Sequence, residues 1–108
     1  PRPRTGAVIL VDDDGKLAGL FTDSDLARLL EQHREDQLDR PVQEVMTRNP
    51  LTTRPDVTVG DLLTTFSSRR VSEIPVVNDA GEPVGLVDIT DVVAFLPEEN
   101  RSASRSVA

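Results

Sequence analysis

The sequence predicts an α+β fold built from two related strand–helix–strand–strand–helix units, the first of which lacks its beginning. Three observations predict it. The phrase "GLFTDSD" at residues 19–25 returns as "GLVDITD" at residues 85–91. Each copy of the phrase follows two short apolar runs separated by turn residues and precedes apolar residues at helical spacing. A further strand and helix are predicted only ahead of the second copy, which therefore has the complete set.

The repeat extends beyond the recurring phrase. Ala7–Leu30 aligns with Glu73–Leu96 at a shift of 66 residues without an insertion, and seven positions are identical. The matched glycines and aspartates fall where turns belong. Because a fixed period of this kind is the signature of duplicated structural units, we interpret the alignment as a real duplication.

The strands of both copies are predicted from apolar runs that flank an acidic or glycine-containing turn. In the first copy the strands are Ala7–Val11 and Leu17–Phe21, joined by the "DDDG" turn. In the second copy they are Ile74–Val77 and Pro83–Val87. Pro75 lies inside a predicted strand, and since proline cannot donate to the ladder, we expect an edge position or a bulge there.

Each hairpin is expected to lead directly into a helix. Thr22 stands at an N-cap position with Asp25 three residues later, and Asp88 takes the cap position of the second copy. The second helix is expected to end at Pro97, whose ring cannot continue it. The apolar helix residues are Leu26, Leu29 and Leu30 in the first copy and Val92, Val93 and Leu96 in the second.

Three further elements are predicted between the copies. Pro41–Met46 is a short helix, and Leu51–Arg54 is a short strand between two prolines. The capping pattern Thr58-x-x-Asp61 opens a helix that runs to about Arg70.

These elements divide the chain into three segments. We expect residues 1–40 to be the C-terminal part of the first unit, 41–97 the complete second unit and 98–108 a disordered tail that lacks apolar periodicity. A repeat whose first copy begins in mid-fold predicts a fragment of a longer protein.

Composition excludes several classes of function. The chain has no cysteine, so disulfides and zinc–thiolate sites are excluded. The net charge of −7 disfavours nucleic acid and anionic membranes as partners, since the twelve basic residues are scattered. No apolar run approaches the ~20 residues of a membrane span, and no signal peptide is recognisable, so we expect a cytoplasmic location.

Signs of catalysis are weak. His33, the one histidine, lies in a polar run without a nucleophile at motif spacing, which favours a surface role. The acidic residues Asp12–Asp14 favour a hydrated hairpin turn over a calcium loop, because further ligands at EF-hand spacing are absent. The chain is therefore not expected to be an enzyme or to hold a metal.

The order of elements, the "MTRNP" segment at 46–50, the "EIPVV" strand at 73–77 and the repeated Gly-hydrophobic-x-Thr/Ser-x-x-Asp phrase resemble the CBS domain, named after cystathionine beta-synthase. The resemblance covers nearly all of residues 5–96. It implies a tandem pair packed sheet to sheet, which binds adenosine nucleotides such as AMP or ATP between its two units and commonly associates into homodimers.

A narrower similarity links residues 5–30 and 41–50 to the C-terminal CBS pair of D-arabinose 5-phosphate isomerases. Those enzymes make a precursor of the sugar acid Kdo for lipopolysaccharide and capsules. The likeness implies an N-terminal catalytic domain in the full protein, and CMP-Kdo as an alternative regulatory ligand.

The resemblance also implies a ligand site at the first helix start. There Asp25 would accept hydrogen bonds from a ribose diol and Thr22 would contact phosphate. The alternative is that both residues only cap the helix. The expected lining from the opposite unit is Thr52, Thr53, Val71 and Ser72.

The second site departs from the family pattern. Asp91 could still hold a ribose, but Asp88 replaces the Thr/Ser and would repel phosphate, and Glu73 adds negative charge. We expect this site to be empty or altered. Two functions stay open: a sensor of a nucleotide or sugar nucleotide that regulates a sugar-phosphate isomerase, or a dimerisation module without ligand.

Overall fold

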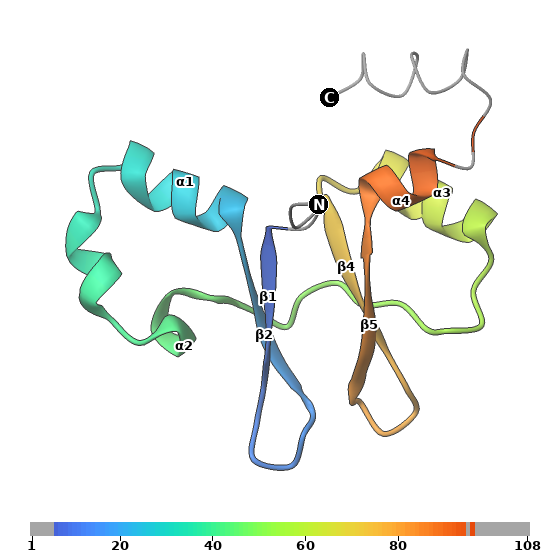
Figure 1. Ribbon diagram of the computed structural model, residues 1–108, viewed down its shortest axis with the longest axis horizontal. Helices are drawn as coiled ribbons and strands as arrows, with labels where there is room; N and C mark the ends of the chain where they lie inside the picture. The colour runs from blue at the N-terminus through green and yellow to red at the C-terminus, as the bar shows by residue number, and fades with distance from the viewer. Residues whose placement is uncertain (1–5, 95, 97–108) are drawn as a thin grey trace, which may run out of the picture.

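The computed structural model describes residues 6–94 and 96, which form two units side by side with a hairpin of each at the centre (Figure 1). The elements are β1 (Ala7–Val11), β2 (Leu17–Thr22), α1 (Asp23–Glu31), the 3₁₀ helix η1 (Glu35–Asp39), α2 (Val42–Val45), β3 (Thr47–Arg48), α3 (Val59–Ser68), β4 (Glu73–Val77), β5 (Pro83–Asp88) and α4 (Ile89–Val93). Within the described residues, no helix is long and apolar enough to span a bilayer.

The two hairpins match in detail, as the repeat predicts. In each hairpin the first strand residue pairs with the last, Ala7 with Thr22 and Glu73 with Asp88. Each ladder also has a register shift at the same place, before Val11 and before Val77. Gly15 and Gly81 turn the chain at φ +79° and +84°, a left-handed conformation that glycine adopts without steric strain. Pro75 itself lies on β4, which is an edge of its two-stranded sheet, and pairs regularly with Leu86, so of the two predicted alternatives the edge position is the one observed.

The segment between the copies differs from the prediction. Leu51–Arg54 is not a strand: only Thr53 bridges β4, in parallel, with its N–H on the Pro75 carbonyl at 3.0 Å. The flanking prolines explain this shortness, because neither can donate to a ladder. Instead the chain forms β3, which pairs antiparallel with β2 in a three-stranded sheet and was not predicted.

The helices were predicted more closely, with two differences. α2 and α3 lie inside the predicted Pro41–Met46 and Thr58–Arg70, whereas η1 was not predicted, because its sequence "EDQLD" has no apolar periodicity. α4 ends at Val93 rather than running up to Pro97. Pro97, the expected tail at 98–108 and Thr5 lie outside the described residues.

The core of the second unit lies where α3 and α4 cover β4 and β5 (Figure 1). Phe66, Ile74 and Val92 form its buried centre. The first unit has no counterpart of α3, and its equivalent residues are exposed: Val8 is 58% exposed where Ile74 is 0%, and Leu26 is 40% exposed where Val92 is 3%. Most of the buried apolar surface therefore belongs to the second unit.

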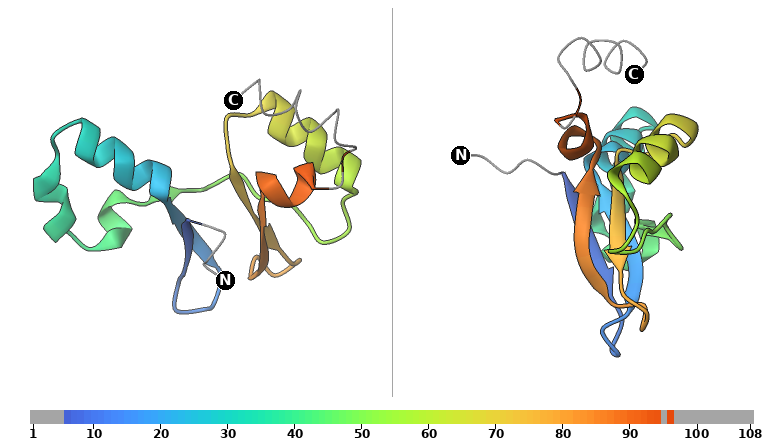
Figure 2. Two further views of the ribbon diagram at one scale, coloured as in Figure 1. Left: turned by 45° about the horizontal axis from the view of Figure 1, so that its top comes forward. Right: turned by 90° about the vertical axis from the view of Figure 1, so that its right-hand side faces the viewer.

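The two units contact each other along their hairpins. The N–H of Leu17 donates to the carbonyl of Gly81 at 2.9 Å, and Lys16 Nζ donates to the carbonyl of Ala80 at 2.6 Å. Both turns lie at one end of the molecule, so that α1 and α4 both begin at the other end (Figures 1 and 2). The pairing of the hairpins thus decides where the two helix starts lie.

Gly19, the first residue of the repeated phrase, provides space for the linker. A Cβ at this position would overlap the side chain of Met46, which leads into β3. At the equivalent Gly85, a Cβ would only reach ordinary contact with Val76, at 3.7 Å. The same glycine therefore has a steric role in the first copy only.

We predict that Gly19→Ala destabilises the chain by about 1–3 kcal/mol, since the Met46 side chain must shift to accommodate the methyl group. Gly85→Ala is the matched control, and its free energy of unfolding should stay within about 0.5 kcal/mol of the parent. Urea unfolding measures both. Equal losses in the two variants would contradict the steric role of Gly19.

Candidate functional site

The start of α1 is held by a reciprocal cap between Thr22 and Asp25. The Thr22 Oγ1 accepts from the Asp25 N–H at 3.1 Å, and Asp25 Oδ2 accepts from the Thr22 N–H at 2.8 Å. The Thr22 hydroxyl also lies 3.1 Å from the same Oδ2. The structure therefore brings together the two residues that the sequence singled out, and it shows that they do cap the helix.

The second oxygen of Asp25 is engaged by Arg28. Arg28 Nη1 donates to Oδ1 at 2.9 Å, one turn further along α1. Asp25 is 8% exposed, whereas the Arg28 side chain is 58% exposed. A buried carboxylate with partners on both oxygens is well compensated for its desolvation. Arg28 was not predicted as part of this site, although its spacing of three residues from Asp25 on a helix was a usable signal.

A third cap in the chain shows that this geometry alone does not make a site. Thr58 and Asp61 form the same reciprocal box at the start of α3, with distances of 3.0 and 3.2 Å. Both residues are exposed there. The Asp25 box differs from it in burial and in what lies nearby.

The start of α4 is capped by an acidic residue, as the sequence predicts. Asp88 Oδ1 accepts from the N–H and the hydroxyl of Thr90, at 2.8 and 2.7 Å. The Asp88 N–H donates to Asp91 Oδ2 at 3.1 Å. The predicted substitution of Asp88 for the Thr/Ser therefore places a carboxylate where the first copy has a hydroxyl.

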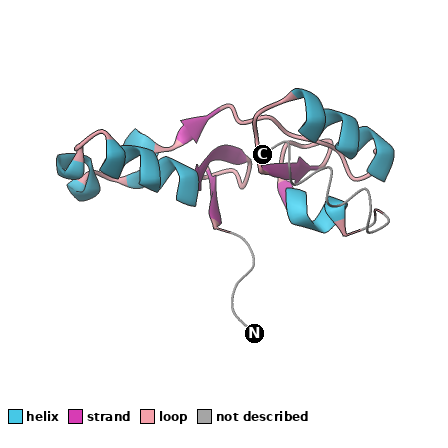
Figure 3. Ribbon diagram, turned by 90° about the horizontal axis from the view of Figure 1, so that it is seen from above, coloured by secondary structure: helices cyan, strands magenta, loops and turns pink. Residues whose placement is uncertain are grey.

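Glu73 connects the two helix starts. It opens β4 directly opposite Asp88, at the last residue of β5. Partial burial raises its pKa, and the nearby carboxylates of Asp88, Asp23 and Asp25 raise it further. The charges that raise this pKa therefore come from residues of both units. Figure 3 shows this end of the molecule from above.

The first turn of α1 contacts the residue that lies just before β1. The Asp23 N–H donates to the carbonyl of Gly6 at 2.6 Å, and a Cβ on Gly6 would overlap the Asp23 side chain. Gly6 therefore lies against the first turn of α1.

The residues expected to line the site from the second unit lie in different settings. Thr53 bridges β4, Thr52 beside it is exposed, and Val71 packs against the core of the second unit. The carbonyl of Ser72 accepts from the Ile89 N–H at the start of α4, at 2.8 Å. Ser72 therefore lies just before β4, at the end of the sheet where α4 begins. The joint role of these four residues with Asp25 stays a prediction.

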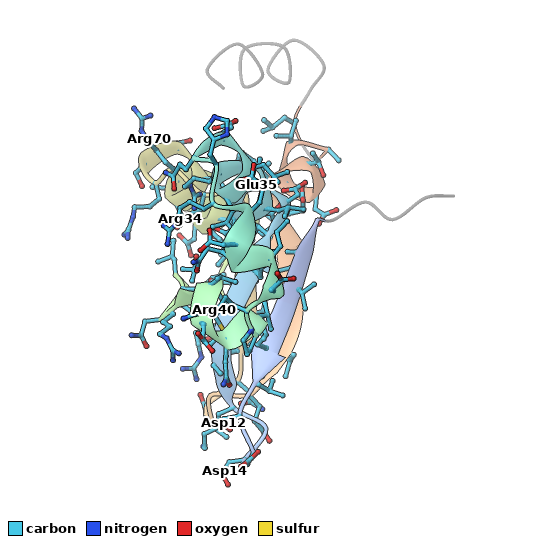
Figure 4. The ribbon with its side chains drawn as sticks, turned by 90° about the vertical axis from the view of Figure 1, so that its left-hand side faces the viewer. Asp12, Asp14, Arg34, Glu35, Arg40 and Arg70 are labelled. Carbon is cyan, nitrogen blue, oxygen red and sulfur yellow. The ribbon has the colours of Figure 1, made fainter. Side chains whose placement is uncertain are left out.

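The other candidates have structural explanations. Asp12 Oδ1 accepts from the N–H groups of Asp14 and Lys16, which closes the hairpin turn at the tip far from the helix starts (Figure 4). Across the described residues, no group of three or more acidic or histidine side chains is arranged to hold a metal ion. His33 is exposed, as expected.

Comparisons with known proteins agree with this architecture. The family model of the CBS domain matches residues 2–32 and 42–98. The chain is 39% identical over 87 residues to arabinose 5-phosphate isomerase KpsF of Escherichia coli, covering 80% of this chain and 26% of that protein. It is 35% identical over 83 residues to L-aspartate semialdehyde sulfurtransferase of Methanocaldococcus jannaschii, covering 77% of this chain and 15% of that protein. The chain thus spans about a quarter or less of these relatives.

One solved structure is similar to most of this chain. It is the CBS domain pair of protein MJ0100 in complex with 5′-methylthioadenosine and S-adenosyl-L-methionine, with a TM-score of 0.72 and 32% sequence identity. The match covers 83% of this chain and 68% of that one.

The raised pKa of Glu73 predicts that this residue destabilises the fold as pH rises. The folded state holds the proton above the ordinary pKa of 4.5, so the stability present below that value is lost as pH increases through the folded-state pKa. Glu73→Gln keeps the shape and removes the charge. We expect it to be more stable than the parent at pH 7.5 and equally stable near pH 4, by urea unfolding across that range.

The control is Asp13→Asn, which removes one negative charge from the exposed first hairpin turn. Its stability curve should keep the slope of the parent. A Glu73→Gln curve that is parallel to the parent at all pH values would contradict the electrostatic role of Glu73.

Proposed function

The chain belongs to the CBS domain family, and on that premise we propose that it is a regulatory module that senses an adenine nucleoside or nucleotide. The observation that supports this most is the buried, capped carboxylate of Asp25 at the start of α1, in a chain whose hairpins contact each other so that α1 and α4 begin at the same end (Figure 1). A ligand that contacts residues of both units there would favour one relative arrangement of the units. Such differential affinity is what regulation by a ligand requires.

Asp25 is the proposed ribose-binding residue. Its Oδ2 is committed to the cap, but Oδ1 is held by Arg28, whose side chain is largely exposed. Because the Arg28 side chain is largely exposed, it can move into solvent while the hydroxyls of a ribose take its place as donors to Oδ1, so the buried carboxylate stays hydrogen-bonded. Thr22 completes the site with a hydroxyl that is already oriented by the same cap.

The adenosine ligands of the similar CBS pair support an adenine-containing ligand. Both compounds named in that complex are adenosine derivatives. They favour the adenine class, which includes AMP and ATP, over a cytidylated sugar acid such as CMP-Kdo. We therefore propose an adenine nucleoside or nucleotide for this chain.

The likeness to the isomerase supports a role for the chain in a longer protein. We infer that the module regulates a sugar-phosphate isomerase of the arabinose 5-phosphate type, from 39% identity over a region that makes up 26% of that enzyme. An assay of the full-length protein with D-arabinose 5-phosphate, with and without adenosine compounds, tests this link. Turnover that is absent, or that no adenosine compound alters, would contradict it.

A second function is favoured by the exposed apolar residues of the first unit. Val8 on β1 and Leu26 and Leu30 on α1 are 40–58% exposed. Ile74 and Val92, which occupy the positions of Val8 and Leu26 in the second unit, are buried against Phe66 of α3. Apolar side chains gathered on one unit are typical of an interaction surface. This supports the alternative that the module serves to associate two copies of the protein.

We predict that Asp25→Ala lowers the affinity for adenosine at least tenfold, because the ribose loses its carboxylate acceptor. Asp61→Ala is the matched control: it removes the same cap position from α3, and binding should be unchanged. Isothermal titration with folding checked by circular dichroism measures both. Equal affinity in the two variants would overturn the proposed role of Asp25.

For the association function, we predict that Leu30→Gln shifts the chain from dimer toward monomer in sedimentation experiments, since the side chain contributes exposed apolar surface. Gln43→Leu adds apolar surface on α2 and serves as a control. A chain that is monomeric at all concentrations would count against association.

A further inference from the structure

We propose that the turn of the first hairpin is a recognition surface whose partner is the turn of the second hairpin, and that the contact between them has a direction. The first turn, with the strand residue that follows it (12–17), supplies the hydrogen-bond donors, and the second (78–83) supplies the acceptors. The inference goes beyond the proposed function, because it concerns how the two units recognise each other and holds for any ligand.

The two turns have the same backbone structure, as the repeat requires. Asp12 in the first turn and Asn78 in the second each accept, through the side-chain Oδ1, from the N–H groups two and four residues later, at 2.9 or 3.0 Å. The N–H groups of Gly15 and Gly81 donate to the carbonyls of the same two residues, both at 3.0 Å. Any difference in how the turns make contacts must therefore come from the residues they carry.

The contact between the turns is not symmetric, although the turns themselves are alike. Lys16 Nζ donates to the Ala80 carbonyl at 2.6 Å, and the Leu17 N–H donates to the Gly81 carbonyl at 2.9 Å. In both hydrogen bonds the donor belongs to the first unit and the acceptor to the second. The first turn therefore approaches the second with its donors, and the second presents two backbone carbonyls.

The sequence explains why the same contacts cannot form in the reverse direction. At the shift of 66 residues, Lys16 corresponds to Glu82 and Leu17 corresponds to Pro83. An ionised carboxylate only accepts hydrogen bonds and proline has no N–H, so neither residue can donate to the first turn. Glu82 contacts its own turn instead, where its Oε1 accepts from Asn78 Nδ2 at 2.9 Å. The second copy has thus kept the turn without its two donors.

Charge favours the same choice of partner. Lys16 and Glu82 occupy equivalent positions with opposite charge, and the turns approach closely there, since a Cβ on Gly15 would lie 3.9 Å from Glu82 Oε2. Two first turns from different copies would place lysine against lysine, and two second turns would place glutamate against glutamate without a donor. Because both pairings are disfavoured and the second turn of the same chain is tethered nearby, the first turn fits the second turn of its own chain.

The place of the contact gives Lys16 a positioning role. The turns lie at the end of the hairpins opposite the starts of α1 and α4 (Figures 1 and 2). A slip of one residue at the turns would move one hairpin along the other by about 3.3 Å, the rise of one strand residue. A directional contact at this end therefore keeps the two helix starts in a fixed relative position.

The test is solution NMR on the whole chain without ligand, with the exchange rate of the Leu17 amide proton as the readout. Lys16→Met keeps an unbranched side chain and removes the donor, and we expect it to speed this exchange about threefold or more. Lys16→Arg keeps a donor, and its rate should stay within about twofold of the parent. Asp13→Asn, an exposed change in the same turn, should leave the rate unchanged.

A double-mutant cycle tests the direction of the contact. Lys16→Glu should speed the exchange of the Leu17 amide about tenfold, because it replaces the donor by a carboxylate close to Glu82. In a chain that carries Glu82→Lys, the same substitution should change the rate by less than about twofold. There the second turn supplies the donor, and the carbonyl of Asp14, the counterpart of Ala80, accepts.

The positioning role has its own readout in the residual dipolar couplings of the two hairpins. They should fit a single alignment tensor in the parent and in the doubly substituted chain, and should no longer do so in Lys16→Glu. A single tensor that fits all three chains would contradict this role.

The amide of Gly15, which is hydrogen-bonded within the first turn, separates the contact from a general loosening of that turn. If the Gly15 and Leu17 amides both exchange faster in Lys16→Met, Lys16 only stabilises its own turn and the recognition contact is wrong. It is also wrong if Lys16→Met leaves the Leu17 rate unchanged, or if Lys16→Glu has the same effect in both backgrounds. These measurements use no ligand, so their outcome is independent of the sensing function.

Discussion

The reciprocal hydrogen bonds between the last strand residue and the third helix residue fix how each helix leaves its hairpin. In the first unit Thr22 and Asp25 form this cap, and in the second unit Asp88 and Asp91 do so. Because the hairpins contact each other at Leu17 and Gly81, the capped ends face the same region. This arrangement has an electrostatic cost, because burial and the carboxylates at the helix starts together raise the pKa of Glu73.

Local features of the fold could be predicted closely from the sequence. The bounds of β1 agree with the prediction, and so do all three caps, since each depends on residues within a few positions of one another. The pairing of Thr47–Arg48 with β2 could not be predicted, because two residues carry no strand pattern of their own and depend on a distant partner. The reduction of Leu51–Arg54 to one bridge has the same cause.

The candidate site, too, could be predicted from the sequence only in its local part. Thr22 and Asp25 were identified from the repeated phrase, whereas Glu73 was recognised only as added negative charge. Its place between the helix starts depends on how the units pack, and a pattern within one copy contains no information on that. Arg28 could have been found from its helical spacing to Asp25, because residues three apart lie on one face.

The two copies of the repeated phrase keep one structural role and differ in the rest. Both cap a helix after a hairpin with the same register shift, which preserves the frame. Gly19 makes space for Met46, whereas Gly85 meets no such neighbour. The hydroxyl of Thr22 has become the carboxylate of Asp88, which still caps a helix because either oxygen accepts from a backbone N–H. Since capping tolerates this exchange, a duplicated frame can stay stable while the groups at its two helix starts differ.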